Sequence, residues 1–393
     1  MFESGLQTLR DLFKQGIFSK PFYSVRVADS DVFSSYEKFR TIPFMRKQSL
    51  RDTPVMERTN ATPEEIFGFF SSSGTTGNKT FYVYSKKDKE VHEMFVREYF
   101  RQINITSKDI GAVMAPVGTG VMAHTMHWQF TTVGASYVDC PEPSSENMLE
   151  IVKKVPVTVV ATRPAIAARV AYDSETITQA RESSVRILAM GGGYLSAERR
   201  KQLEYAWDAE CYNLLGMSEV FGPVAAECAQ KNGMHYLDRF LLIEVLDPVT
   251  KEPVPDGFPG IAVYTTLWDK GFPLLRYWSD DYIRIDRSPC PCGSKLPRVY
   301  YLGRMADHIN TGSRLVFPEQ VENILFSYDL TGEFQVVYSE KDYSVEVESE
   351  EIANPPEGVA AALSELFTGN VFVRLIPFGA LGRGETRIHF LRR

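Results

Sequence analysis

The spacing of apolar residues predicts a mainly helical start to the chain. Over residues 1 to about 65, leucine and phenylalanine recur at helical intervals, as shown by Leu6, Leu9, Leu12 and Phe13. Pro63 suits the first turn of a further helix. The apolar run 66–70 that follows is typical of a strand, so the pattern predicts helical scaffold that leads into a first strand.

Beyond this strand the pattern predicts alternating helices and strands. Residues 85–102 carry many charges, with apolar side chains along one face, so we expect an amphipathic helix that starts near Ser85. Buried strands are then predicted at 110–115, 135–138, 157–161 and 185–190, and helices at 147–154, 164–172 and 196–207. This alternation is typical of a parallel α/β sheet, which binds ligands at the carboxyl ends of its strands.

The pattern changes after Cys211 to short strands separated by turn residues. These strands are predicted at 240–246, 260–266, 274–277, 282–285 and 299–302, and they form a β-rich subdomain attached to the α/β body. A boundary is expected near residues 303–310, before a small α+β module. We therefore predict a body over residues 1–302, with parallel and mixed sheets, and a second domain over residues 303–393.

Composition and charge narrow the class of protein. The chain has 393 residues, 44% of them hydrophobic and 24% charged, which is ordinary for a globular protein. The net charge is -7 and no long basic run occurs, which disfavours nucleic acid and anionic membranes as partners. The first residues lack the pattern of a signal peptide, and no apolar stretch reaches membrane-spanning length, so we expect a cytoplasmic protein.

A hydroxyl-rich loop follows the predicted strand 66–70. Its glycines allow a close backbone approach to a ligand, and its hydroxyl and amide groups are suitable donors to phosphate oxygens. The residues concerned are Ser72, Ser73, Gly74, Thr75, Thr76, Gly77 and Lys79. The spacing is not that of a Walker A loop. From these residues alone, a phosphate site and a polar surface turn are equally supported.

Two further stretches carry carboxylates near predicted strand ends. Glu219 follows a glycine turn and is a candidate Mg²⁺ ligand, although a glutamate at a helix start is the commoner use of such a residue. Asp281 belongs to an Arg-Tyr-Trp-Ser-Asp-Asp run that starts at Arg276, and its carboxylate suits a ribose diol. A solvated turn is the alternative. Gly192 and Gly193 end another predicted strand and are expected to face the same crevice.

Four cysteine and histidine residues in the second half of the chain suit a metal. Cys228, His235, Cys290 and Cys292 supply three thiolates and one imidazole, which is the shell of a closed, structural Zn²⁺ site. The Cys-Pro-Cys-Gly run at 290–293 favours metal binding over chance in a reducing compartment. Cys140 and Cys211 lie in apolar contexts and are predicted to be core residues.

Taken together, these stretches resemble the phenylacetate-coenzyme A ligase branch of the adenylate-forming enzymes. The resemblance covers about residues 65–325 and rests on motifs that occur in the family's order: Ser72–Gly77, 215–223 with Glu227 and Cys228, 247–250, 265–267, 273–277, Asp281, 290–293, Gly303, Arg304, Asp307 and 317–318. It implies a large N-terminal body with a zinc-binding insertion, a mobile C-terminal lid, and a reaction in two steps. A carboxylic acid first reacts with ATP to form an acyl-adenylate and pyrophosphate. A thiol, usually that of coenzyme A, then takes the acyl group.

The resemblance also implies roles for individual residues. Phosphate contacts fall to Ser73, Thr75 and Thr76, Mg²⁺ binding to Glu219, ribose binding to Asp281, contacts near ribose or phosphate to Arg304, and the lid hinge to Asp307. Met217 and Ser218 belong to the magnesium-and-adenine segment. Zinc ligation matches Cys228, His235, Cys290 and Cys292. An aromatic or heteroaromatic acid is favoured, in a pocket built from residues 116–128 that includes His124 and His127.

Several departures from the family pattern leave alternatives open. Leu215 replaces the aromatic residue that stacks on adenine, with Tyr194 as a substitute, and Gly312 comes one residue early after the hinge. Glu385 occupies the place of the catalytic lysine, where a negative charge would repel the departing phosphates. Arg383 is a neighbouring substitute. A carrier-protein thiol or an amine therefore remains an alternative acceptor, and a non-catalytic nucleotide-binding protein remains an alternative function. Separately, the sequence leaves open whether the protein forms a homodimer.

Overall fold

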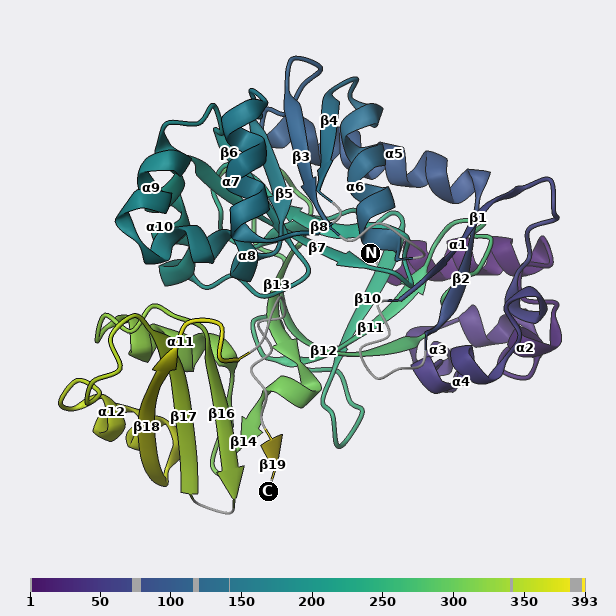
Figure 1. Ribbon diagram of the computed structural model, residues 1–393. Coiled ribbons are helices and arrows are strands. Elements are labelled where there is room, and N and C mark those ends of the chain that lie inside the picture. The colour runs from purple at the N-terminus through teal and green to yellow at the C-terminus, as the bar shows by residue number, and fades with distance from the viewer. Residues whose placement is uncertain are drawn as a thin grey trace. The chain divides into compact units, whose positions relative to one another are not determined.

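The computed structural model describes residues 2–72, 79–115, 120–140, 142–339, 342–381 and 391–392 (Figure 1). These residues divide into two compact units. The first comprises residues 1–108, 116–137 and 214–300, and the second residues 109–115, 138–213 and 301–393. The predicted domain boundary at 302/303 stays a prediction. In the described part of the chain, no helix is long and apolar enough to cross a membrane.

The first unit begins with short helices, as the sequence predicts. They are α1 (Phe2–Lys14), α2 (Pro21–Ser24), η1 (Ser30–Phe33), α3 (Tyr36–Phe39), α4 (Lys47–Asp52) and η2 (Val55–Arg58). In α1, Leu6, Leu9 and Leu12 are buried, which confirms the helical spacing. Pro63 does not start a helix. Residues 62–65 form a turn, in which the Thr62 carbonyl accepts from the N–H of Glu65, and strand β1 (Ile66–Ser71) begins directly after it.

A β-hairpin and a long helix come next. Strands β1 and β2 (Phe81–Ser85) pair antiparallel and form their own two-stranded sheet. Helix α5 (Lys86–Gln102) starts at Ser85, whose Oγ accepts from the N–H of Asp88 at 3.1 Å while the Asp88 carboxylate accepts from the N–H of Ser85. This reciprocal cap explains why the helix begins where the sequence predicts.

The remaining strands of the first unit run in the spatial order β10-β11-β12-β13-β9-β8-β7. Their bounds are β7 (Glu210–Met217), β8 (Gly222–Glu227), β9 (Met234–Tyr236), β10 (Leu241–Leu246), β11 (Gly260–Thr266), β12 (Tyr277–Asp286) and β13 (Arg298–Arg304). β7 and β13 each continue into the second unit. The prediction of two strands at 274–277 and 282–285 is wrong, because residues 277–286 form the single strand β12. Helix α6 (Val121–Thr132) was not predicted.

The second unit contains the run β6-β5-β3-β4. These strands are β3 (Ile110–Met114), β4 (Ser136–Cys140), β5 (Val159–Thr162) and β6 (Ile187–Gly191), and β3, β5 and β6 pair in parallel as predicted. The helices are α7 (Ser145–Lys154), α8 (Pro164–Ala168), η3 (Arg169–Tyr172), α9 (Ser174–Arg181) and α10 (Ala197–Trp207). Trp207 and Leu203 of α10 pack with Val160 and Leu188 in one core. β4 was predicted to be buried but is mostly exposed, because it lies at the edge of the sheet.

The C-terminal part of the second unit is an α+β module, as predicted. It contains η4 (Met305–Asp307), β14 (Ile309–Asn310), β15 (Leu315–Val316), α11 (Pro318–Phe326), β16 (Phe334–Ser339), β17 (Asp342–Ser349), α12 (Val359–Phe367), β18 (Asn370–Pro377) and β19 (Leu391–Arg392). The strands β18-β17-β16-β19 form one sheet, and α11 and α12 share a core with it. The mixed α/β architecture predicted from the sequence is therefore confirmed.

Candidate active site

The hairpin β1–β2 closes the base of the predicted phosphate loop. Its last pair is Ser71 with Phe81, and beyond it the N–H of Ser72 donates to the Thr80 carbonyl at 3.0 Å. The N–H of Thr80 donates to Ser72 Oγ at 3.3 Å. Ser72 is buried and Lys79 is exposed. The other loop residues of the prediction lie outside the described part of the chain: Ser73, Gly74, Thr75, Thr76 and Gly77.

Glu219 lies in the turn between β7 and β8, and tyrosine hydroxyls hold its carboxylate. Glu219 is 6% exposed, and its Oε1 accepts from Tyr82 Oη at 2.9 Å and from Tyr277 Oη at 3.1 Å. Burial, and next the charge of Glu219, raises the pKa of both tyrosines, so both hydroxyls keep their protons and donate. Two neutral donors orient the carboxylate without cancelling its charge.

Helix α4 joins Glu219 to the base of the loop. Lys47 Nζ lies 3.7 Å from Glu219 Oε1, and Arg51 Nε donates to Thr80 Oγ1 at 3.2 Å. Lys47 and Arg51 are four residues apart and therefore lie on one face of the helix. This face brings two positive charges, a buried carboxylate and the end of the hydroxyl-rich loop into one region of the first unit.

A buried histidine supports the turn that carries Glu219. His92 of α5 is 2% exposed, and its Nδ1 lies 3.0 Å from the Phe221 carbonyl, which can only accept, so Nδ1 carries the proton. Burial lowers the pKa of His92 to about 4. Gly222 follows with a φ of +105°, and a Cβ atom there would lie 2.7 Å from His92 Nδ1. The turn therefore needs both a neutral imidazole and a glycine.

Aromatic rings gather beside this turn, with centroids between 3.9 and 6.5 Å apart. They belong to Phe67, Phe70, Tyr84, His92, His124, Trp128 and Phe221. The two predicted pocket histidines both belong to helix α6, and their ring centroids lie 6.3 Å apart. His124 lies 5.2 Å from Phe70 within the cluster, whereas His127 stacks on Tyr137 at 4.7 Å. Residues 116–119 of the predicted pocket are outside the described residues.

The four predicted zinc ligands come together in the first unit. The ligand atoms of Cys228, His235, Cys290 and Cys292 all lie within 4.8 Å of one another. Cys228 follows β8, His235 is in β9, and the other two cysteines lie between β12 and β13. His235 Nδ1 lies 3.0 Å from the Leu296 carbonyl, which leaves Nε2, 3.4 Å from Cys292 Sγ, on the side of the thiols. This chemistry fits Zn²⁺, since a metal-bound histidine usually donates its other N–H to a carbonyl or carboxylate.

The run at Arg276 is arranged differently from the prediction. Arg276 makes a two-pronged contact with the buried Glu244, with Nε–Oε2 and Nη2–Oε1 distances of 2.9 and 3.0 Å. Asp281 lies inside β12 rather than at a strand end, and it is 2% exposed. Met217 is the last residue of β7, and the Ser218 carbonyl accepts from Tyr84 Oη. The ribose and adenine roles of these residues stay predictions.

The other predicted nucleotide residues belong to the second unit. Gly192, with a φ of +78°, and Gly193 follow β6 as predicted. Tyr194 packs against the core of the C-terminal module, and its buried hydroxyl has no hydrogen-bond partner among the described residues. Arg304 ends β13 and Asp307 ends η4. Their nucleotide roles stay predictions, and residues 383–387, with Glu385, lie outside the described part of the chain.

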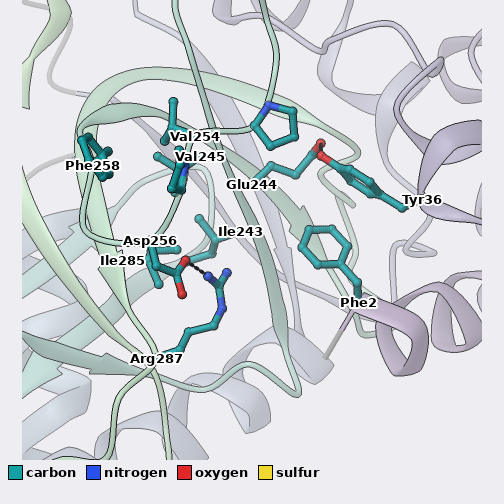
Figure 2. Close-up of a pocket in the computed structure, with 12 residues that line it drawn as sticks. Phe2, Tyr36, Ile243, Glu244, Val245, Val254, Asp256, Phe258, Ile285 and Arg287 are labelled. Carbon is teal, nitrogen blue, oxygen red and sulfur yellow. Dashed lines mark hydrogen bonds and ion pairs between the residues drawn. The ribbon is translucent and has the colours of Figure 1, made fainter.

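A cavity of about 230 Å³ in the first unit is separate from these residues (Figure 2). Its walls are mainly apolar side chains of β10 and of residues 253–258. At one side Tyr36 Oη lies 3.2 Å from Glu244 Oε1, and at another Asp256 pairs with Arg287. None of the residues predicted for nucleotide, acid or metal lines this cavity, so it is not the predicted nucleotide site.

The chain belongs to the family of AMP-binding enzymes, whose model matches residues 22–265. This confirms the adenylate-forming superfamily that the motifs predict. Among curated proteins, the phenylacetate-coenzyme A ligase of Thermus thermophilus is 29% identical over 81% of this chain and 73% of its own length. The phenylacetate-coenzyme A ligase of Escherichia coli K12 is 24% identical over 82% of this chain and 75% of its own length.

Solved structures show the same fold. A 2-hydroxyisobutyryl-CoA ligase in its postadenylation state, with bound 2-HIB-AMP, superimposes with a TM-score of 0.83. It is 19% identical and covers 99% of this chain and 88% of its own. The anthranilate CoA ligase AuaEII, with anthranoyl-AMP, superimposes with a TM-score of 0.61 at 16% identity, over 88% of this chain and 73% of its own.

The residues that surround Glu219 were not predicted from the sequence. Tyr82, Tyr277 and Lys47 come from β2, β12 and α4, and no pattern in the sequence links these three positions. The only local indication was the pair Lys47 and Arg51 at helical spacing. His92 was likewise missed, because a single histidine on an amphipathic helix has no distinctive context.

Proposed function

We propose that this protein activates a carboxylic acid with ATP and passes the acyl group to a thiol, that of coenzyme A. In the first step the acid carboxylate attacks the α-phosphorus of ATP, forms an acyl-adenylate and releases pyrophosphate. In the second step the thiolate sulfur attacks the acyl carbon and AMP leaves. An acid-thiol ligase of this AMP-forming kind is similar in activity to the phenylacetate-coenzyme A ligases among its relatives.

The observation that supports this proposal best is the arrangement around Glu219. A buried carboxylate is held by Tyr82 and Tyr277, and α4 contacts both it and Thr80, at the end of the hydroxyl-rich loop. A polyphosphate needs donors and positive charge, and its metal ion needs a carboxylate, so this region suits a magnesium–nucleotide complex. The loop is therefore better explained as a phosphate site than as a polar turn.

Glu219 would hold the Mg²⁺, whose charge shields the phosphate oxygens from the incoming carboxylate. The chain's own residues orient Glu219, because the hydroxyls of Tyr82 and Tyr277 both donate to its carboxylate. Lys47 adds a positive charge at 3.7 Å. Since Glu385 stands where the family has a lysine, we infer that Lys47 and Arg51 supply part of the positive charge at the phosphates.

An aromatic or heteroaromatic acid is the proposed substrate class. The ring cluster around Trp128 and Phe221, next to α6, provides edges and faces on which a flat ring packs well. His124 is a polar residue of this cluster that would distinguish a substituted ring from an unsubstituted one. A panel of aromatic, heteroaromatic and short aliphatic acids, screened for pyrophosphate release, tests this choice directly.

We also propose a structural Zn²⁺ at Cys228, His235, Cys290 and Cys292. Burial raises the pKa of the Cys228 thiol to about 12 in the metal-free geometry, so a cation is the natural partner for a thiolate there. With four protein ligands no position stays open for water, and the ion would tie the loop before β13 to the strands β8 and β9. Such an ion has a structural role and no role in acyl transfer.

A non-catalytic nucleotide-binding role is the second candidate, and Glu385 favours it. A protein of this kind would bind ATP without turnover, and Glu385→Lys would then create pyrophosphate release. The acceptor is a separate question. The shifted Gly312 motivates a carrier-protein thiol or an amine as the acceptor, and mass spectrometry of the products formed with each acceptor distinguishes these from coenzyme A.

The decisive experiment removes one of the two tyrosine hydroxyls that donate to Glu219. Tyr82→Phe is expected to lower acid-dependent ATP–pyrophosphate exchange by roughly 10- to 100-fold and to raise the Mg²⁺ requirement, since a hydrogen bond to a charged group contributes about 1.5–3 kcal/mol. Tyr99→Phe is the matched control, because Tyr99 Oη donates to the Val224 carbonyl at 3.1 Å and is also buried. Equal effects of the two variants, or wild-type protein without exchange for any acid, would contradict the proposal.

A further inference from the structure

A lysine side chain is completely buried in the first unit. Lys270 lies in the segment between β11 and β12 and is 0% exposed (Figure 1). Its Nζ has no hydrogen-bond partner among the residues that the structure describes. Burial lowers the pKa of Lys270 to about 8, so the amine still carries its charge at neutral pH. A buried ammonium without hydrogen bonds opposes folding, so stability does not explain why a lysine stands here.

The segment that carries Lys270 is anchored on both sides of the lysine. Trp268 Nε1 donates to Asp88 Oδ1 at 2.8 Å, and the N–H of Gly271 donates to Asp88 Oδ2 at 3.2 Å. Asp88 belongs to the cap at the start of α5. A Cβ atom on Gly271 would lie 3.0 Å from Ser85 Cβ, so the backbone passes close to this helix start. These contacts fix the backbone of Lys270 beside α5.

Two aromatic rings contact the buried ammonium. Lys270 Nζ lies 5.3 Å from the ring centroid of Tyr84 and 5.1 Å from that of Phe272. An aromatic face attracts a cation, and the attraction is stronger where water is excluded. A positive charge beside a phenol also strengthens its hydroxyl as a donor, because the charge favours negative charge on the oxygen. Tyr84 Oη donates to the carbonyl of Ser218, so Lys270 acts on the ring that holds the backbone next to Glu219.

The turn that carries Glu219 has a strained backbone and needs support from outside. Phe221 has a φ of +74° and Gly222 a φ of +105°, and the left-handed region is unfavourable for phenylalanine. The Phe221 ring stacks on Tyr84, with ring centroids 3.9 Å apart and an interplanar angle of 28°. Tyr84 therefore holds the turn at two points, through its hydroxyl at Ser218 and through its ring at Phe221.

We propose that Lys270 is a positioning residue for Glu219: its buried ammonium holds Tyr84, and Tyr84 holds the turn that presents Glu219 to Mg²⁺. The part that concerns Mg²⁺ rests on the proposed function, whereas the support of the turn does not. Lys270→Met removes the charge and fills nearly the same volume. Since a buried charge without a hydrogen bond is lost, this variant should be at least as stable as wild type and yet have a looser turn.

The first measurement is the Mg²⁺ dependence of ATP–pyrophosphate exchange in the full chain, with an acid that the panel identifies. We expect Lys270→Met to raise the Mg²⁺ concentration for half-maximal exchange roughly tenfold, without any decrease in the free energy of unfolding in urea. A loss of stability with an unchanged Mg²⁺ dependence would show a merely structural role and overturn the proposal. Unchanged stability together with an unchanged Mg²⁺ dependence would overturn it as well.

A second variant, Tyr84→Phe, tests whether Lys270 acts through Tyr84. It removes only the hydroxyl, and its effect combined with Lys270→Met should be smaller than the product of the two single effects, because both changes weaken one chain of contacts. Effects that multiply would overturn the proposal. Arg284→Met is the matched control, because Arg284 Cζ lies 3.6 Å from the ring centroid of Tyr300 in the same unit. A rise in the Mg²⁺ requirement equal to that of Lys270→Met would contradict the proposed role.

Hydrogen exchange tests the support of the turn even when no acid is activated. In that case the proposed function fails, while the turn is still measurable in the unliganded chain. The N–H of Val220 donates to the Met217 carbonyl at 3.3 Å, so amide exchange over residues 217–222 reports on the turn. Lys270→Met should speed this exchange roughly tenfold and leave β10 and β11 as protected as in wild type. Unchanged exchange over residues 217–222, or an equal increase throughout the first unit, would overturn the proposal.

Discussion

Acidification is expected to destabilise the protein through His92, which is neutral and buried in the native state. In the unfolded chain a histidine has a pKa of about 6.5, whereas burial lowers the pKa of His92 to about 4 in the folded protein. Between these values the unfolded state binds a proton that the folded state does not. The free energy of unfolding therefore falls as the pH drops from about 6.5 and reaches its lower limit near pH 4.

The size of the effect follows from the two pKa values. A difference of about 2.5 pH units corresponds to about 3 kcal/mol, with a maximum slope of about 1.4 kcal/mol per pH unit. Protonation of Nε2 would place a charge among the rings of Trp128 and Phe221, which lie 6.3 and 5.3 Å from the imidazole. The unfolding transition should begin at the turn that His92 supports, next to Glu219.

The assay is urea unfolding at pH values from 7.5 to 4, for wild type and for His92→Asn. Asparagine can still donate to the Phe221 carbonyl but does not titrate in this range, so the variant should lose stability at pH 7.5 and show a shallower dependence on pH. His127→Asn is the control, because His127 stacks on Tyr137 outside the buried cluster. A pH dependence of His92→Asn as steep as that of wild type would refute the reasoning.

Three other changes test the fold around the site. Arg276→Met should lower the free energy of unfolding by about 3–5 kcal/mol in chemical denaturation, because it strands the buried Glu244, whereas Arg287→Met breaks an exposed pair and should change it by less than about 1 kcal/mol. Similar losses in the two variants would contradict this. Cys292→Ser should abolish stoichiometric zinc in metal analysis and lower the melting temperature. If the purified wild-type protein contains no zinc, the proposed zinc site is wrong. Gly222→Ala should lower stability by about 2 kcal/mol or more in thermal unfolding, since φ is +105° there, and an unchanged melting temperature would disprove the steric argument.

Local sequence was enough to predict most elements and the chemistry of the ligands. The capping pair at Ser85 and Asp88, the periodicity of α1, and the apolar runs of β3, β5 and β6 depend on residues a few positions apart, and these elements form as predicted. The cluster of three cysteines and one histidine was predictable for another reason. Thiolate and imidazole side chains have few roles, so four of them in the family's order identify a site despite the long sequence gap.

Tertiary structure decided which groups meet around that chemistry. Glu219 lies 137 positions from Tyr82 and 58 from Tyr277 in the chain, and only the packing of β2, the β7–β8 turn and β12 brings the two hydroxyls to its carboxylate. The sequence around Arg276 is compatible with ligand binding, yet its guanidinium donates to the carboxylate of Glu244 on β10. Side-chain periodicity specifies which face of an element is buried, but it does not specify the partner on the facing element. For this reason only the tertiary structure determines which residues contact Glu219 and Arg276.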